Sequence, residues 1–256
     1  MGGMRLSIVD SFTGTPFAGN PAGVVLLDEP ADPAWMQSVA AELRHSETAF
    51  VEVTGDGPKP LRWFTPTVEV DLCGHATLAA GHVLGGEQVF TTRSGELRTR
   101  AADGWVSMDF PNDPPRAADD DVLDALPGVT IAGVARGKWD ILVEATDAAQ
   151  VRELKPDLDV IAGWDARCVI VTAPGDRDDV DFVSRVFGPA VGVPEDPVTG
   201  SAHCLLAPFW AEKLGRVKLV GEQASERGGI VRVLVNGDRV TLSGQAVTVV
   251  SGELHA

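Results

Sequence analysis

Hydrophobic and polar residues alternate in short runs along most of the chain, and Gly, Pro, Asn and Asp separate these runs. This pattern is typical of half-buried strands joined by short turns. In the first half it predicts strands at 4–10, 24–27, 48–53 and 61–65, then an antiparallel meander at 88–92, 96–101 and 105–110. In the second half it predicts strands at 134–135, 141–144, 167–172, 230–235, 239–242 and 247–250. Strands grouped in this way exclude a wholly parallel, doubly wound sheet.

Two segments depart from the strand pattern because small apolar residues fill them on all sides, as in a buried helix. The first follows Cys73-Gly74 and ends near Gly85, and the second follows Gly200 and ends at Gly215. Their starts lie about half a chain length apart, which predicts two related halves with one central helix each. Glycine at a helix start lets a ligand approach the free N–H groups, and the helix dipole there favours a carboxylate or phosphate.

Capping residues predict further local structure. Asp32 followed by Pro33 predicts a helix to about residue 43, and Asp147 predicts one to about residue 154. The acidic segment 119–126 suggests a short helix, whereas 178–186 has an apolar helical face but stays ambiguous. Asn236-Gly237 is the preferred hairpin turn, and the Pro-rich segment 111–115 is a linker candidate.

Net charge, cysteine content and the absence of certain motifs exclude several classes of partner and cofactor. The 256-residue chain has a formal net charge of −16, which argues against nucleic acid and anionic membranes as partners. Three cysteines cannot all pair and match no zinc motif, and residues 1–10 lack the apolar core of a signal peptide, so we expect a cytoplasmic protein. No glycine-rich nucleotide-binding motif is present.

Several polar residues near the two helix starts could carry chemistry, although each also has a structural interpretation. Taken alone, Glu47 fits a solvated acid better than a general acid or base, and Asp196 before Pro197 fits a turn residue. His75 fits a capping histidine, and Ser201 a first-turn residue. Their functional interpretation is proton transfer and ligand binding around the helix starts.

Cys73 could act as a base, because a thiol beside a helix N-terminus has a lowered pKa. A racemase with two thiol bases would need a matching cysteine in the second half. The matching position is Thr199, and Cys204 lies about one turn into the helix. A symmetric two-thiol mechanism is therefore not supported.

Taken together, these motifs resemble the phenazine-biosynthesis PhzF-like isomerases along essentially the whole chain. The resemblance rests on Asp10-Ser11-Phe12-Thr13, Gly19-Asn20-Pro21, Ser46-Glu47-Thr48, Phe64-Thr65-Pro66, Cys73-Gly74-His75-Ala76-Thr77, Asp109-Phe110-Pro111 and Glu195-Asp196-Pro197-Val198-Thr199-Gly200-Ser201-Ala202, and the tail with Gln223 and Gly228-Gly229 is also similar.

The resemblance implies an α+β protein with the diaminopimelate-epimerase-like fold. Such a protein has two similar halves, each a curved, mostly antiparallel sheet around a central helix, with an active cleft between them. We expect an N-terminal half at 1–112, completed by the last strands at about 240–256, and a C-terminal half at 113–240. The resemblance also implies a homodimer.

It further implies a cofactor-independent isomerase or epimerase that moves a proton on a small carboxylate-bearing, amino-acid-like or cyclic substrate. In the phenazine enzyme the glutamate that matches Glu47 moves a proton between carbons of a cyclic, amino-acid-like diene. By the same match His75 and Asp196 assist catalysis, and no metal is expected. Residues expected to bind substrate are Gly74, Gly200, Ser201, Asn20 and Cys73.

Two alternatives stay open. One is an amino-acid racemase that uses Cys73 as a base, since the chain carries this cysteine ahead of Gly74-His75, as thiol epimerases do. The other is a metabolite-binding protein of the same fold without catalysis. The physiological substrate is not specified by the sequence.

Overall fold

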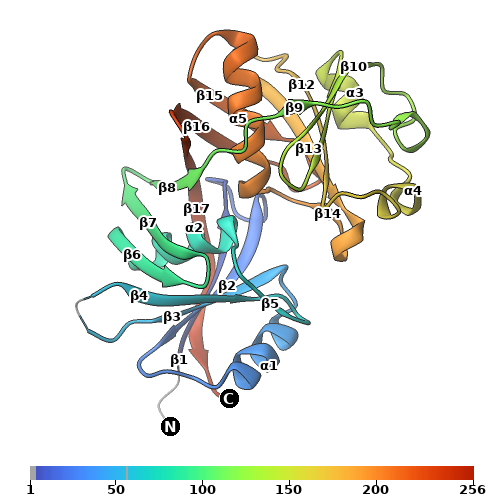
Figure 1. Cartoon of the computed structure of the whole chain (residues 1–256). Coiled ribbons are helices and arrows are strands. Elements are labelled where there is room, and N and C mark those ends of the chain that lie inside the picture. The colour runs from blue at the N-terminus through green and yellow to red at the C-terminus, as the bar shows by residue number, and fades with distance from the viewer. Residues whose placement is uncertain (1–3, 56) are drawn as a thin grey trace. The chain divides into compact units, whose positions relative to one another are not determined.

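A computed structural model describes residues 4–55 and 57–256 (Figure 1). Residues 1–3, which begin the segment where no signal peptide is expected, lie outside the described residues. The chain forms two compact units: unit 1 runs to Asp109 and includes Ser243–Ala256, and unit 2 is Phe110–Leu242. Among the described residues, no helix has the length and apolar character that a membrane span requires.

Unit 1 is built from strands that enclose one buried helix. Its elements are β1 (Met4–Ser11), β2 (Asn20–Leu27), α1 (Pro33–Leu43), β3 (Glu47–Glu52), β4 (Lys59–Phe64), β5 (Glu69–Val70), α2 (Gly74–Leu84), β6 (Gly86–Thr92), β7 (Gly95–Ala102) and β8 (Trp105–Pro111). The last strand, β17 (Arg239–Leu254), pairs with β1 in antiparallel register from Met4↔Leu254 to Ser11↔Ala246. Helix α2 contacts β1, β2, β3, β6 and β7. Its residues His75–Gly81 are all buried, as expected for a helix with small residues on every side.

Unit 2 repeats the combination of strands and one long buried helix. Its elements are β9 (Arg116–Ala117), β10 (Ile131–Arg136), β11 (Ile141–Ala145), α3 (Ala148–Glu153), α4 (Leu158–Ala162), β12 (Val169–Pro174), β13 (Phe182–Gly188), β14 (Val193–Asp196), α5 (Gly200–Leu214), β15 (Lys218–Gln223) and β16 (Gly229–Asn236). Helix α5 packs on β15 and β16. Phe182 stacks on Trp210 of α5, and the Trp210 indole donates a hydrogen bond to Thr172 Oγ1 on β12.

The elements with strong local signals lie where the sequence predicts them. Helix α1 begins after Asp32, whose side chain accepts from the Ala34 N–H, and α3 begins after Asp147 in the same way. Helices α2 and α5 begin at Gly74 and Gly200, and Gly215 ends α5 in the left-handed conformation. The meander of β6, β7 and β8 is antiparallel throughout.

Three segments differ from expectation. The prediction of an α-helix at 119–126 is wrong: only the short 3-10 helix Leu123–Ala125 forms, and Pro127 disfavours α-helical backbone at the residue before it. The ambiguous segment 178–186 contains strand β13, which is held between β12 and β15. The linker candidate is fixed to unit 2, since the N–H groups of Asn112 and Asp113 donate to carbonyls of Asp238 and Cys204. Helix α4 was not expected.

Candidate functional site

Glu47 and His75 meet in unit 1 through strand pairing and the start of a helix. Glu47 is the first residue of β3, which runs parallel to β2 with Ala22 opposite Glu47. His75 is the second residue of α2 and is 5% exposed. The Glu47 Oε2 and His75 Nε2 atoms are 3.4 Å apart. The structure thus brings together two of the three residues that the sequence selects for catalysis.

Ser46 and Asn20 complete the polar contacts on the Nε2 side of His75. Ser46 Oγ is 3.3 Å from His75 Nε2 and donates to Asn20 Oδ1 at 3.4 Å. Asn20 is fully buried at the start of β2. The Ser11 hydroxyl donates to the His75 carbonyl at 2.8 Å. These bonds hold the imidazole in place beside Glu47.

Cys73 lies on the other edge of the imidazole, with Sγ 3.5 Å from His75 Nδ1. Its backbone is extended at the helix start, and within the described ranges its side chain makes no capping hydrogen bond to α2. The start of α2 therefore has no side-chain cap from Cys73, and the helix dipole at Gly74 favours an anion. Each of Glu47, Cys73 and His75 offers one ligand atom, and these atoms lie within 4.8 Å of one another, so the set also suits a zinc ion.

The electrostatic environment favours the neutral form of Glu47. Burial raises the pKa of this carboxyl above its ordinary value, although hydrogen bonds with Ser46 and Cys73 act in the opposite direction. A carboxyl with a raised pKa can exchange a proton closer to neutral pH than an exposed one. This arrangement is suited to general acid–base chemistry.

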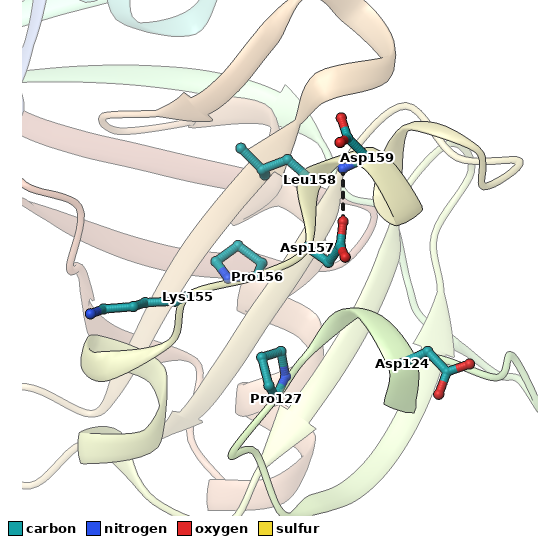
Figure 2. Close-up of a pocket in the computed structure, with 7 residues that line it drawn as sticks. All are labelled: Asp124, Pro127, Lys155, Pro156, Asp157, Leu158 and Asp159. Carbon is teal, nitrogen blue, oxygen red and sulfur yellow. Dashed lines mark hydrogen bonds between the residues drawn. The ribbon is translucent and has the colours of Figure 1, made fainter.

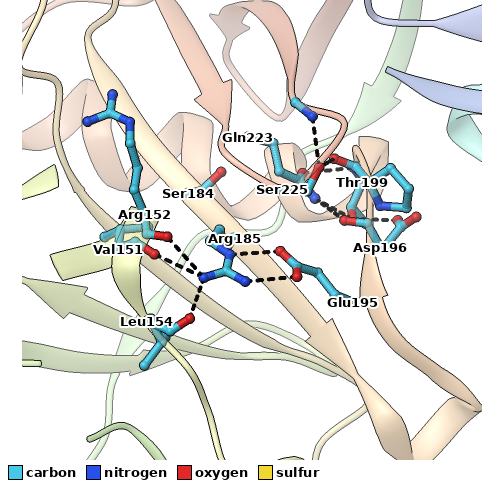
Figure 3. Close-up of polar contacts among 12 residues, drawn as sticks. Val151, Arg152, Leu154, Ser184, Arg185, Glu195, Asp196, Thr199, Gln223 and Ser225 are labelled. Carbon is cyan, nitrogen blue, oxygen red and sulfur yellow. Dashed lines mark hydrogen bonds and ion pairs between the residues drawn. The ribbon is translucent and has the colours of Figure 1, made fainter. Parts of the chain in front are cut away.

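Unit 2 carries a second polar cluster where β14 leads into α5 (Figure 3). Thr199 Oγ1 donates to Asp196 Oδ2 at 2.5 Å, so the Thr199 side chain does not cap α5. The fully buried Gln223 of β15 accepts from the Thr199 N–H at 2.8 Å and donates to the Asp196 carbonyl at 2.7 Å. Asp196 is thereby fixed at the start of α5.

Ser201, in the first turn of α5, is contacted by a residue that sequence reasoning did not select. Arg167 donates to Ser201 Oγ at 3.1 Å and binds the buried carboxylate of Asp140 through two hydrogen bonds. Thr199 and Gln223 were also not selected. Gln223 was noted in the tail that resembles the family, which is the one signal that could have found it.

Two other residues near this cluster are poor proton-transfer groups. Burial, assisted by the charge of Asp140, raises the pKa of the Cys168 thiol to about 12. Burial lowers the pKa of His203 to about 4, and His203 Nδ1 lies 2.8 Å from the Thr199 carbonyl. Both are therefore neutral near pH 7.

An open surface depression of about 500 Å³ lies elsewhere in unit 2 (Figure 2). Lys155 is its one basic residue, and Asp124, Asp157 and Asp159 are acidic. It contains none of the residues expected to bind or convert a substrate. The structure therefore groups Glu47, His75, Cys73, Gly74 and Asn20 in unit 1 and the remaining candidates, Asp196, Gly200 and Ser201, in unit 2.

Comparison with known proteins shows the family to which the chain is related. A family model described as phenazine biosynthesis-like protein matches residues 9–252. An uncharacterized isomerase of Halalkalibacterium halodurans is 45% identical over 258 residues, which cover 96% of this chain and 97% of that protein.

Solved structures show the same fold. A phenazine biosynthesis protein of the PhzF family from Enterococcus faecalis superposes with a TM-score of 0.94 at 38% identity, covering 100% of both chains. A hydroxyproline epimerase from Agrobacterium vitis, solved with bound trans-4-hydroxy-L-proline, has a TM-score of 0.64 at 11% identity, covering 98% of this chain and 90% of that one. The chain therefore belongs to the phenazine biosynthesis-like family, has the epimerase-like fold of its relatives, and is an isomerase.

Proposed function

We propose that this isomerase moves a proton on a small carboxylate-bearing, amino-acid-like or cyclic compound without a cofactor, and that Glu47 is the acid–base residue. The observation that carries the proposal is the burial of Glu47 against His75 and Cys73 at the start of α2. A substrate carboxylate would bind the uncapped N–H groups of α2, where the helix dipole stabilises negative charge.

The reaction follows from this arrangement. Ionised Glu47 takes a proton from a substrate carbon, and the electron pair left on that carbon delocalises into the adjacent carboxylate or double bond. The protonated Glu47 then returns the proton to another carbon on the same face of the substrate, so that no proton or electron is gained or lost overall. His75 holds the carboxyl in position through the 3.4 Å contact.

We include the second polar cluster in the proposal: Asp196 assists catalysis, and Gly200 and Ser201 bind substrate. The support is the precise hydrogen bonding of Asp196 through Thr199 and Gln223, together with the uncapped start of α5. Loss of turnover in an Asp196→Asn variant that folds normally supports this part, and full turnover contradicts it.

Solvent deuterium exchange tests the role of Glu47. The purified protein is incubated in D2O with a panel of carboxylic acids that includes L-proline, D-proline, trans-4-hydroxy-L-proline and cyclic unsaturated amino acids, and deuterium on carbon is measured by NMR and mass spectrometry. Glu47→Gln should lower the exchange rate by roughly 10²- to 10⁴-fold. Glu52→Gln, at the other end of β3, is the matched control and should exchange normally. Equal exchange in Glu47→Gln and wild type would contradict the proposal.

A second candidate is a racemase in which Cys73 is a base, and the 3.5 Å contact between Cys73 Sγ and His75 Nδ1 favours it. Cys73→Ser separates the two candidates, because it abolishes exchange in the thiol mechanism and leaves the glutamate mechanism largely active.

Dialysis against a chelator tests cofactor independence. Unchanged activity supports it, and activity that returns with added metal contradicts it.

We also propose that the isomerase is a cytoplasmic homodimer, as its resemblance to the family implies. Among the described residues the three cysteines form no disulfide, which fits a reducing compartment. Light scattering checks the dimer: a mass of twice the 26.9 kDa chain supports it, and a monomer mass contradicts it.

A further inference from the structure

Both ends of the Gln223 side-chain amide form hydrogen bonds with backbone groups, one of which can only donate and the other only accept. Its Oε1 accepts from the N–H of Thr199 at 2.8 Å, and its Nε2 donates to the carbonyl of Asp196 at 2.7 Å. A backbone N–H only donates and a backbone carbonyl only accepts. The orientation of this fully buried amide is therefore set, and a flipped amide would lose both bonds.

The fixed amide determines where the Thr199 proton points. Gln223 Nε2 also lies 3.2 Å from Thr199 Oγ1, and since Nε2 is a donor, the hydroxyl oxygen must accept. A hydroxyl has one proton, and the other partner of Thr199 Oγ1 is Asp196 Oδ2 at 2.5 Å. The hydroxyl proton therefore points at Asp196.

A carboxyl oxygen that accepts this proton does not carry a proton in the same direction. From this chain of bonds we propose that Gln223 is a positioning residue which, through Thr199, holds the Oδ2 atom of Asp196 as a hydrogen-bond acceptor of fixed orientation. A substrate group that contacts this oxygen is then a donor, such as an amino or hydroxyl group, in addition to the carboxylate of the substrate.

This inference rests on the proposed participation of Asp196 in catalysis, but its first test needs no substrate. A neutron structure of the deuterium-exchanged wild type shows the hydrogen positions directly. We expect deuterium on Thr199 Oγ1 directed at Asp196 Oδ2, and none on Asp196 Oδ2. Deuterium on Asp196 Oδ2, or an amide of Gln223 in the opposite orientation, would overturn the inference whatever the enzyme converts.

The second test uses variants and the compound of the panel above that the wild type exchanges fastest. Thr199→Val removes the hydroxyl and should lower kcat/KM roughly 10- to 100-fold, as expected when a carboxyl group loses a hydrogen-bond partner that holds it in position. Thr199→Ser keeps the hydroxyl and should restore the rate to within about threefold of wild type. Gln223→Leu should resemble Thr199→Val. The double variant should lose no more than Thr199→Val alone, because the two residues act in one chain of bonds.

Ser184→Ala is the matched control, since Ser184 is also fully buried and makes one 3.4 Å bond to the carbonyl of Glu222, beside Gln223. It should retain the wild-type rate. If Gln223 had a purely structural role, the loss of kcat/KM in each variant would follow the decrease of its melting temperature, and Thr199→Ser would not restore the rate. That result would refute the inference. The wild type could exchange no compound while the neutron structure is as expected. That result would count against the proposed function, but the inferred directions of the hydrogen bonds at Asp196 would still hold.

Discussion

At the scale of single residues, Glu47 is a carboxyl group that folding removes from water, and its burial should affect stability. Its pKa is raised in the folded protein by that burial. A carboxyl of this kind contributes stability below its unfolded pKa, and the contribution is lost as the pH rises through the folded pKa. Glu47→Gln should therefore melt at a higher temperature than wild type at pH 8, and the difference should shrink towards pH 4.

Thermal unfolding followed by circular dichroism across this pH range measures the effect. Glu52→Gln lies on the same strand and should show no such gain at pH 8. A Glu47→Gln protein that melts below wild type at pH 8 would mean that hydrogen bonds to the carboxylate outweigh its burial.

Cys168 shows the same effect of burial on a thiol, which is kept neutral. With a pKa raised to about 12 instead of 9.0, the thiolate fraction at pH 8 is about 1000-fold smaller than that of an unperturbed cysteine. Cys168 in the folded protein should therefore react with iodoacetamide far more slowly than the same cysteine in urea. Peptide mass spectrometry reports the modified fraction over time. Equal rates in the two states would contradict the prediction.

At the scale of elements, helix α5 contains a histidine that should make the protein sensitive to acid. Burial lowers the pKa of His203 from 6.5 to about 4. Between these values the unfolded chain binds a proton that the folded chain does not, so stability falls as the pH drops from 6.5 to 4. Over this pH range the lowered pKa of His203 decreases the free energy of unfolding by about 3 kcal/mol.

His203→Gln should flatten this part of the stability curve, and the Gln amide can still donate to the Thr199 carbonyl that faces Nδ1. Urea unfolding at pH 7 and pH 4.5 measures the change. The loss of stability between the two pH values should be smaller in the variant by about 2–3 kcal/mol. His255→Gln is a suitable control, because the side chain of His255 is exposed near the C-terminus. If His203→Gln lost as much stability between pH 7 and pH 4.5 as the wild type, the loss would come from groups other than His203.

The helices also show which features of the fold can be predicted from sequence. Asp32, Asp147 and Gly215 act on their own backbone neighbourhood, so α1, α3 and α5 are predictable from a few adjacent residues. Strand β13 is different, because it pairs both with β12, which precedes it in the chain, and with β15, which lies beyond α5. Its apolar residues fit a helix or a strand until those partners are known.

The same distinction applies to the candidate site. Glu47 and His75 are far apart in sequence, and local patterns favour a solvated acid and a capping histidine. Their 3.4 Å contact depends on the packing of α2 against β3, so resemblance to a family identified it where local chemistry could not. Gln223 was missed as a site residue because its role depends on two backbone groups of another segment.

At the scale of the whole molecule, the charge of the chain and the charge of the proposed substrate have the same sign. The formal net charge is −16, whereas the proposed anion sites are the uncapped starts of α2 and α5. Helix dipoles act over about one turn, but the repulsion of a net charge reaches a Debye length, which is ~30 Å at 0.01 M salt and ~10 Å at 0.1 M. At low ionic strength the overall repulsion should therefore slow the approach of a carboxylate.

We expect kcat/KM for an anionic substrate to rise as sodium chloride is increased from about 10 to 150 mM, by roughly two- to threefold, because salt screens the long-range repulsion more than the short-range contacts. A neutral amide or ester of the same compound, used as a competitive inhibitor, should bind with little dependence on salt. The opposite slope, with kcat/KM falling as salt is added, would show that a local positive potential governs the encounter. In that case Arg167, which contacts Ser201 in the first turn of α5, would be the first residue to replace.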